Sequence, residues 1–411
     1  MVRTLKTQFL LIINNRLLKM QAIGMLLCLP MLILFLFSSL EHQSIQYAED
    51  VARQSEYAQE DMEFMKTTFD ASLQEKHARE FQLDSMVVQK AEYFAKGQYV
   101  SYLQEAVNSW KLYFSLQKVR GYNITESQFP ALHYGTNMAF DDVKRGTLNI
   151  NFARQRVAIF EGMLASTKEV TINELVGITA RGQFYRWLGH AGPEVLYLPL
   201  FFLLTLLFSS PIFLDDKQHE SLLEVKPISH LKYLLDKIIS YWLLISGFEI
   251  FLLAIILFAI SSRFGAGDWT LGILTFVGQE EVQISSMEFY GKAVLFFLLI
   301  NFFLITCLAS CNKIFSNKPL TICLSGLVLF LEPLLRFLQI NFLGQDLLPS
   351  YYISFGPVLH GVKDYFFYRG DFSVEKGWIV LSLWTLVLFT MMYLSVLVRE
   401  RFRQERGRIW G

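Results

Sequence analysis

The sequence predicts an all-α polytopic membrane protein that crosses the bilayer six times. Hydrophobic residues make up 53% of its 411 residues and the mean hydropathy is +0.34, whereas soluble domains contain roughly 45 to 50% apolar residues. The apolar residues gather in runs close to the roughly 20 residues that an α-helix needs to cross about 30 Å of hydrocarbon. We expect transmembrane helices at residues 20–40, 194–214, 238–260, 293–310, 319–335 and 378–398.

Basic residues flank these spans on one side only. The 37 Lys and Arg balance the 37 Asp and Glu, so the asymmetry does not appear in the net charge. By the positive-inside rule, segments with Lys and Arg close to the spans face the cytoplasm. The basic positions include Arg16, Lys19, Lys217, Lys232, Lys313, Lys318 and Arg399. We therefore expect a multi-pass protein of the bacterial plasma membrane with both termini in the cytoplasm.

Residues 1–19 mix apolar positions such as Phe9 and Ile13 with Lys6, Arg16 and Lys19. This pattern predicts an amphipathic helix that lies in the inner membrane interface. The alternative is an irregular extension of the first span. No cleavage site with small residues follows Leu40, so we interpret the span at 20–40 as an uncleaved anchor.

Residues 41–190 are numerous enough to form a domain outside the membrane. Apolar residues recur there at steps of three and four, which is the helical period, so we expect a mainly helical extracellular domain built on a long helix pair. The stripe consists of Tyr99, Tyr102, Leu103, Ala106, Val107, Trp110 and Phe114. It is either the core of the helix pair, which we favour, or an exposed surface for a hydrophobic cargo.

The four cysteines lie in or beside the spans, and none falls within residues 41–190. The sequence thus excludes a disulfide framework for the outer domain. Cys307 and Cys311 have no His or acidic residue nearby that would complete a metal site, so we expect no metal.

Catalytic motifs are missing from the sequence. It contains no GxxxxGK[ST] phosphate loop, no HExxH and no GxSxG. We expect the chain not to be an enzyme, and if it performs work, the energy must come from an ion gradient or from another subunit.

The segment from Pro211 to Lys237 joins the second and third spans and has an ordered pattern. We expect a short helix at about residues 214–226, with acids near its start, an apolar pair near its end and a proline that stops it. These residues are Asp215, Asp216, Glu220, Leu222, Leu223 and Pro227. Ser229 is placed to cap the next helix, which carries Lys232 and Lys237 into the third span.

With this segment, ESLLEVKPISHLKYLLDK, and its six-span plan, the chain resembles the membrane (permease) subunit of type 2 ATP-binding-cassette (ABC) exporters. The large domain between the first two spans resembles a subgroup of that family. The resemblance implies that two permease chains, identical or related, pair in the membrane and that each docks the helix at 214–226 on one of two separate ATPase subunits. It implies that ATP and Mg bind to the partner ATPases, and that this chain itself holds no cofactor.

The resemblance also assigns roles within the docking helix. Leu222 and Leu223 would supply the buried contact with the ATPase. Asp215, Asp216 and Glu220 would form the charged rim, and Pro227 would act as a stiff joint.

The last outer stretch, residues 337–376, is too apolar for an exposed loop. Its central residues are Tyr351, Tyr352, Phe355, Gly356 and Pro357. In the family that the chain resembles, a re-entrant pair of short helices forms an outer gate here, with the Gly-Pro step providing the reversal. An aromatic belt at the membrane interface is the alternative.

Charged residues also fall within the spans. Glu249 lies near the middle of the third span, where a charge costs roughly 2.5 to 3.5 kcal/mol, and should face protein or water. It is either a proton relay or, as we favour, one partner in a hydrogen bond between helices. Glu332 and Arg336 are four residues apart in or just after the fifth span and can pair along one helix face.

Together these features favour the permease subunit of an exporter that moves a hydrophobic or amphipathic substrate, such as a peptide, an antibiotic or a lipid-like molecule. We expect membrane lipids but no nucleic acid among its partners. One alternative is a membrane-anchored sensor or scaffold whose outer helical domain binds a ligand or a protein. Another is a carrier driven by an ion gradient, which would use Glu249 as its relay.

Overall fold

Helices dominate the computed structural model of the chain, which describes residues 10–120, 142–166, 169–188, 197–213, 229–277, 280–315, 317–338, 340, 342–363 and 371–409. By length and composition, four helices could cross a membrane. They are α2 (Arg16–Thr68), α11 (His230–Phe264), α12 (Ser286–Phe315) and α16 (Val374–Ile409). Two shorter apolar helices, α9 (Tyr197–Ser209) and α13 (Lys318–Phe337), pack beside them. The expected predominance of helix is thus confirmed, and four of the six expected spans fall in helices long and apolar enough to cross a membrane.

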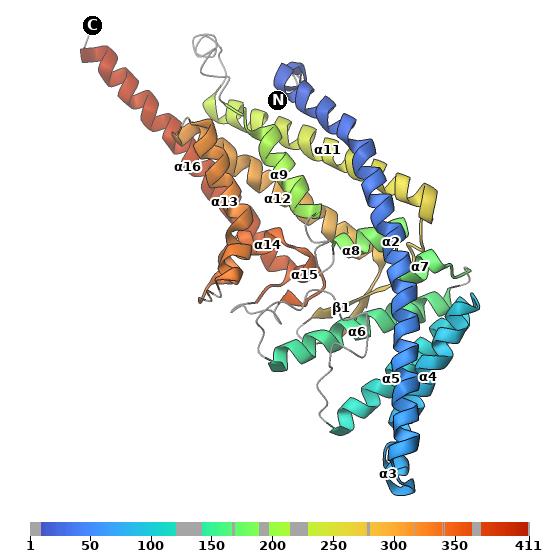
Figure 1. The fold of residues 1–411 in the computed structure, drawn as a ribbon. Coiled ribbons are helices and arrows are strands. Elements are labelled where there is room, and N and C mark those ends of the chain that lie inside the picture. Colours follow the sequence, from blue (N-terminus) through green and yellow to red (C-terminus); the bar gives the residue numbers. More distant parts are fainter. Residues whose placement is uncertain are drawn as a thin grey trace.

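The predicted first span is only part of α2. This helix has 53 residues and runs through Pro30, so it continues far beyond residue 40 into the domain at the far end of the molecule (Figure 1). Residues 10–14 form a separate helical turn before it. No helix end marks residue 40, because the polar residues that follow are also good helix formers.

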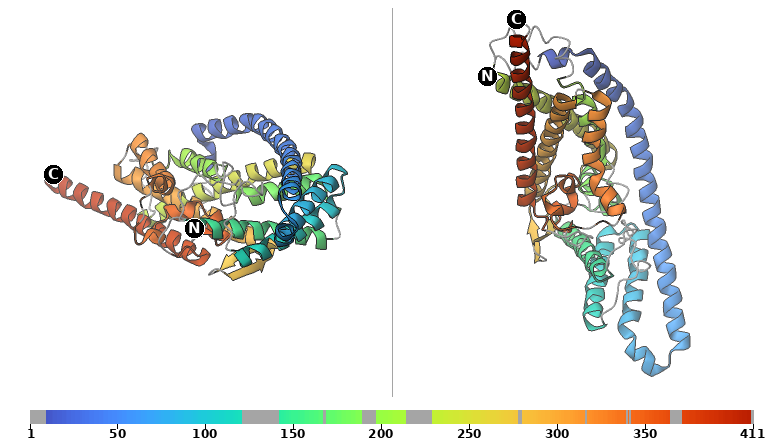
Figure 2. Two further views of the ribbon diagram at one scale, coloured as in Figure 1. Left: turned by 60° about the horizontal axis from the view of Figure 1, so that its bottom comes forward. Right: turned by 90° about the vertical axis from the view of Figure 1, so that its left-hand side faces the viewer.

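The domain between the first two apolar helices contains α3 (Ala71–Lys76), α4 (Ala78–Ala95), α5 (Tyr99–Arg120), α6 (Asp142–Ala165), α7 (Ile172–Val176) and α8 (Ala180–Trp187). The α4–α5 pair packs against α2 and projects away from the bundle (Figure 2). The aromatic stripe on α5 lies inside this domain, where Leu103, Val107 and Trp110 are buried. The hydroxyls of Tyr47 on α2 and Tyr102 on α5 lie 2.8 Å apart. The stripe is therefore core.

An antiparallel hairpin, β1 (Ile273–Val277) with β2 (Glu280–Ile284), lies between α11 and α12 and was not expected in an all-α protein. Ile273 pairs with Ile284 and Thr275 with Val282. Ile, Thr, Phe and Val favour extended backbone. The segment is short, and β2 is polar, so the hydropathy of the sequence does not distinguish it from a loop beside the long apolar runs.

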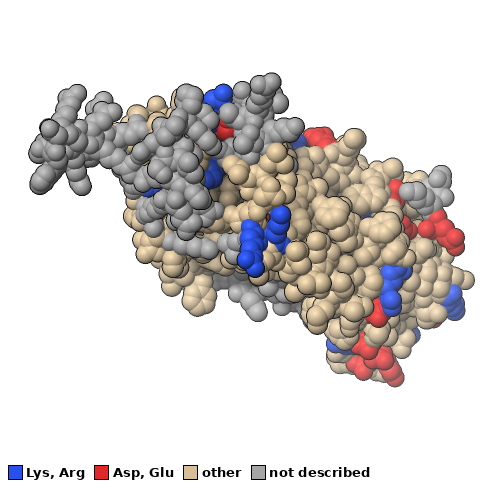
Figure 3. All heavy atoms as spheres, turned by 90° about the horizontal axis from the view of Figure 1, so that it is seen from above, with Lys and Arg blue, Asp and Glu red and all other residues tan. Residues whose placement is uncertain are grey.

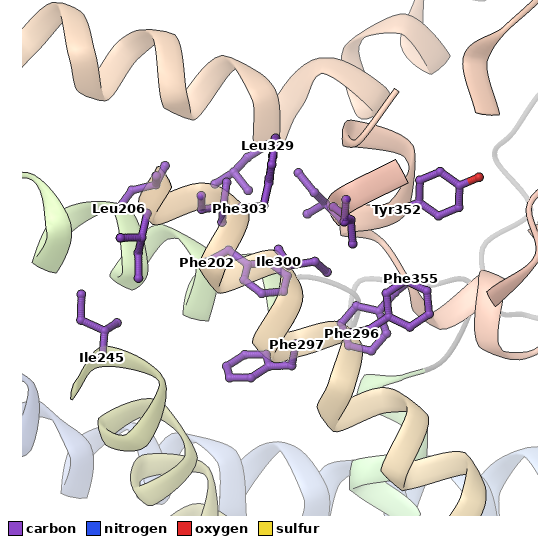
Figure 4. Close-up of a cluster of buried hydrophobic side chains, with 14 of the residues drawn as sticks. Phe202, Leu206, Ile245, Phe296, Phe297, Ile300, Phe303, Leu329, Tyr352 and Phe355 are labelled. Atoms are coloured by element: carbon purple, nitrogen blue, oxygen red, sulfur yellow. The ribbon is translucent and has the colours of Figure 1, made fainter. Parts of the chain in front are cut away.

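Helix α12 lies at the centre of the bundle. It contacts α9, α11, α13, α15 and α16, and its residues on several sides are fully enclosed, among them Phe296, Ile300 and Leu304. Figure 4 shows Phe296, Phe297, Ile300 and Phe303 on this helix among Phe202 and Leu206 of α9 and Leu329 of α13. Since α12 contacts more helices than any other of the described elements, it is the helix around which the others are arranged.

The segment between α13 and α16 contains the short helices η5 (Gln345–Leu347), α14 (Ser350–Ile353) and α15 (Gly356–Leu359). Gly356 and Pro357 are the first two residues of α15. The backbone after α15 is joined to β1, because the Phe276 amide donates to the His360 carbonyl (3.0 Å). Gly361 follows with φ 66°, and a Cβ there would overlap the Phe276 carbonyl oxygen.

Gly361→Ala should destabilise the protein more than Gly344→Ala. Both glycines have positive φ (66° and 91°), so either alanine costs about 1–2 kcal/mol of backbone strain. Only Gly361 also faces a clash, whereas a Cβ on Gly344 meets nothing within 4 Å. Thermal unfolding of the two purified variants in detergent measures the difference. Equal losses in Tm would show that the contact between α15 and β1 contributes nothing.

Candidate functional site

The predicted docking helix lies outside the described residues. Asp215, Asp216, Glu220, Leu222, Leu223 and Pro227 all belong to residues 214–228. The structure does describe both flanks of this segment. Pro211 to Phe213 follow α9, and Ser229 occupies the N-cap position of α11, as expected, although its side chain makes no cap hydrogen bond.

The end of α9 is clamped to α11 and α12. Asn312 of α12 donates its side-chain amide to the carbonyls of Ser210 (3.2 Å) and Ile212 (2.9 Å). These carbonyls follow the last turn of α9 and need donors, since helix C-termini leave carbonyl groups without helical partners. The next residue, Phe213, adopts φ 65°, which is uncommon for a bulky residue and costs on the order of 1–3 kcal/mol.

Two lysines hold the ring of Phe213. The ammonium groups of Lys237 on α11 and Lys313 on α12 lie 4.9 and 4.4 Å from the ring centroid. Such cation–π contacts contribute about 0.5–2 kcal/mol each, depending on how far the cation is desolvated. We name this arrangement of Phe213, Lys237, Asn312 and Lys313 the inner clamp. It fixes the point at which the chain leaves the bundle toward residues 214–228.

Four polar side chains meet in the middle of the bundle, and all four are buried: Thr205 of α9, Ser246 and Glu249 of α11, and Asn301 of α12. The Thr205 hydroxyl lies 2.7 Å from Glu249 Oε1 and 2.8 Å from Asn301 Oδ1. Asn301 Nδ2 lies 2.6 Å from Glu249 Oε2 and 3.2 Å from Ser246 Oγ. We name this cluster the polar core.

Hydrogen counting assigns a proton to Glu249. The contacts among Thr205, Glu249 and Asn301 form a closed ring of three, and each needs one hydrogen. Thr205 has one hydroxyl hydrogen and the Asn301 amide supplies one, so the third comes from the carboxyl group. Exchanging the oxygen and nitrogen of Asn301 leaves the count unchanged. Glu249 is therefore neutral, which removes the cost of a buried charge.

The polar core extends the single hydrogen bond between helices that the sequence favoured. Thr205, Ser246 and Asn301 were missed, although an Asn at the centre of an apolar run is a usable signal. No second carboxylate among the described residues joins the ring, so these contacts give no onward path to a proton from Glu249.

A buried ion pair ties the segment that contains η5, α14 and α15 to α13. Lys363 Nζ lies 3.1 Å from Glu332 Oε1, with side chains only 1% and 4% exposed. Lys363 also donates to the Tyr351 carbonyl and lies over the rings of Tyr351 and Phe372. The expected partner of Glu332 was Arg336, whose side chain is outside the described part of the chain. Lys363 carried no sequence signal because it lies outside the spans.

The residues predicted for an outer gate do come together. Tyr351, Tyr352 and Phe355 are at most 1% exposed, and Phe355 stacks on Phe296 of α12 with ring centroids 5.5 Å apart (Figure 4). Gly356 and Pro357 are buried beside them. The rings therefore pack inside the protein instead of pointing outward, as they would in an aromatic belt facing lipid. Whether they form a gate stays a prediction.

No family model, no curated protein and no solved structure matches the chain.

Glu249→Gln should preserve the polar core, whereas Glu249→Leu should not. The Gln amide can donate to Thr205 and its carbonyl can accept from Asn301, as the neutral carboxyl group does. Leu leaves Thr205 and Asn301 without these partners at a cost of about 1–3 kcal/mol. Thermal unfolding in detergent tests the contrast. If Gln is as damaging as Leu, Glu249 is ionised and the hydrogen count is wrong.

Lys363→Met alone and Glu332→Leu alone should each cost about 3–5 kcal/mol of stability, because each leaves an uncompensated buried charge. The double variant should recover most of that loss, since both charges are gone. A double-mutant cycle on unfolding free energies checks this coupling. Additive losses would mean that the two charges do not stabilise each other.

Proposed function

We propose that the chain is the permease subunit of an ATP-driven exporter with six spans, α2, α9, α11, α12, α13 and α16. The inner clamp carries the proposal. It holds Phe213, the residue immediately before 214–228, against α12, the helix that α9, α11, α13 and α16 all contact. A force applied to that segment would reach the centre of the bundle without passing through a loose loop.

The arrangement of the ends supports this topology. The start of α2, the end of α16, the end of α9 and the start of α11 lie at one end of the bundle, and the domain with α4 and α5 lies at the other (Figures 1 and 2). Seen from the end with the termini, Lys and Arg side chains reach the surface (Figure 3). This agrees with a cytoplasmic face under the positive-inside rule and with the helical domain on the outer side.

The proposed mechanism requires partners. Two permease chains would pair, and the segment with Leu222 and Leu223 on each would dock into a separate ATPase that binds ATP and Mg. The inner clamp would pass closure of the ATPases to α12, whose other end contacts the outer short helices through Phe296 and Phe355. The cargo class that fits an apolar, aromatic bundle is a hydrophobic or amphipathic molecule.

The test is purification together with the products of neighbouring genes, followed by ATP hydrolysis assays with candidate peptides and lipids. Leu222→Asp with Leu223→Asp should reduce the retained phosphate-loop ATPase roughly tenfold or more, because the variant puts two charges in the buried contact. Ser221→Asp adds a charge beside the pair without removing apolar surface and should leave the ATPase bound.

Two results would overturn the proposal. One is a stable complex that lacks any ATPase, which would favour a sensor or scaffold. The other is transport that stops when the proton gradient is removed and that fails in Glu249→Gln, which would favour a carrier.

A further inference from the structure

Among the described residues, Arg181 is a buried cation whose side chain makes a single long hydrogen bond. It lies on α8, is 4% exposed, and can offer five N–H groups. One nitrogen, Nη2, donates to the Leu271 carbonyl at the long distance of 3.4 Å, and Nε meets no acceptor among the described residues. Since a guanidinium does not lose its proton in proteins, Arg181 keeps its charge in this enclosed position.

A second source of positive potential lies beside it. Ser286 is the first residue of the 30-residue helix α12, and its hydroxyl donates to the same Leu271 carbonyl that Arg181 uses. The N-terminal end of a helix carries a partial positive charge, so this position disfavours a cation and favours an anion.

The acidic residues closest in sequence to Leu271 and Ser286 already have other interaction partners. Glu288 pairs with Lys292 at 2.8 Å. Asp268 accepts from the hydroxyls of Ser166 (2.9 Å) and Thr270 (2.7 Å). Among the described residues, no carboxylate forms an ion pair with Arg181, so its guanidinium has no direct counter-ion there.

Aromatic side chains pack together in the same region. Phe184, one turn after Arg181 on α8, stacks on Tyr290 of α12 with centroids 5.0 Å apart, and Trp269 lies 5.3 Å from Tyr290. The Tyr290 hydroxyl is buried and has no hydrogen-bond partner in the described part of the chain. Burial raises the pKa of neighbouring Tyr185, and the charge of Arg181 opposes that increase, so the cation reaches this phenol as well.

We propose that Arg181, Tyr290 and the N-terminus of α12 form a binding site for the phosphate group of an anionic membrane lipid. A phosphate would supply the counter-ion that the described residues do not provide, with enough oxygens for the guanidinium, the phenol and the helix end. Aromatic rings at the end of a membrane bundle are suited to the boundary between headgroup and acyl chain, which favours a lipid over a free ion. The site stands independently of the proposed export function.

The test measures lipid binding to the full chain, purified in detergent and stripped of lipid. Phosphatidylglycerol should raise Tm and remain bound in native mass spectrometry, while phosphatidylcholine and inorganic phosphate should do so far more weakly. Arg181→Met keeps the length of the side chain but removes its charge, and should weaken phosphatidylglycerol binding about tenfold or more. Arg263→Gln, an exposed arginine that pairs with Glu41, is the matched control and should bind lipid normally.

A second variant guards against a folding defect in Arg181→Met. Tyr290→Phe removes only the hydroxyl, and should weaken lipid binding severalfold without lowering the Tm of the lipid-free protein. Inorganic phosphate that binds as tightly as the lipid would overturn the lipid assignment. Glu194, an acid outside the described residues, provides the other check. Glu194→Gln should leave the stability of the lipid-free protein unchanged. If it instead lowers that stability, and the double variant Arg181→Met with Glu194→Gln restores it, a carboxylate of the chain itself is the counter-ion of Arg181 and the lipid site does not exist.

Discussion

The polar core is the interaction on which the arrangement of the bundle depends. Hydrocarbon offers polar groups no partners, and Thr205, Glu249 and Asn301 satisfy one another inside the bundle. Because they come from α9, α11 and α12, their ring of hydrogen bonds fixes the rotation and depth of three helices at once. Apolar packing alone does this poorly, since lipid tails compete equally well for an apolar helix face.

Helix α12 connects this core to both ends of the molecule. At one end Asn312 and Lys313 hold the end of α9 and the ring of Phe213. At the other end Ser286 meets the segment after α11, and further along the helix Phe296 stacks on Phe355, the N-cap residue of α15. A small movement of α12 would therefore change the inner clamp and the outer helices together, because packed contacts transmit displacement instead of absorbing it.

The sequence predicted the features that depend on the local pattern of apolar residues, namely where helices lie and which face of a helix is buried. Runs such as 238–260 and 378–398 fall inside observed helices, and the stripe on α5 is buried at the predicted spacing. It could not predict how far helices extend: α2 passes residue 40 because polar residues continue a helix as readily as apolar ones.

The sequence pattern also could not predict contacts between residues that are far apart in the chain. Lys363 meets Glu332, and Arg181 reaches the Leu271 carbonyl that Ser286 of α12 also uses, only because the tertiary fold brings them together. Glu249 was recognised because a lone acid in an apolar run has a high desolvation cost, whereas Thr205 and Ser246 are common in membrane helices and carry no such signal.

The docking of residues 214–228 on an ATPase is tested most directly by a photo-crosslinking amino acid placed at Leu222 in living cells. Mass spectrometry of the cross-linked product should identify a protein with a phosphate loop, and the same probe at Ser72 on α3, in the helical domain at the opposite end of the molecule, should not. Cross-links from position 222 only to lipid, or to proteins without a phosphate loop, would contradict the proposed function.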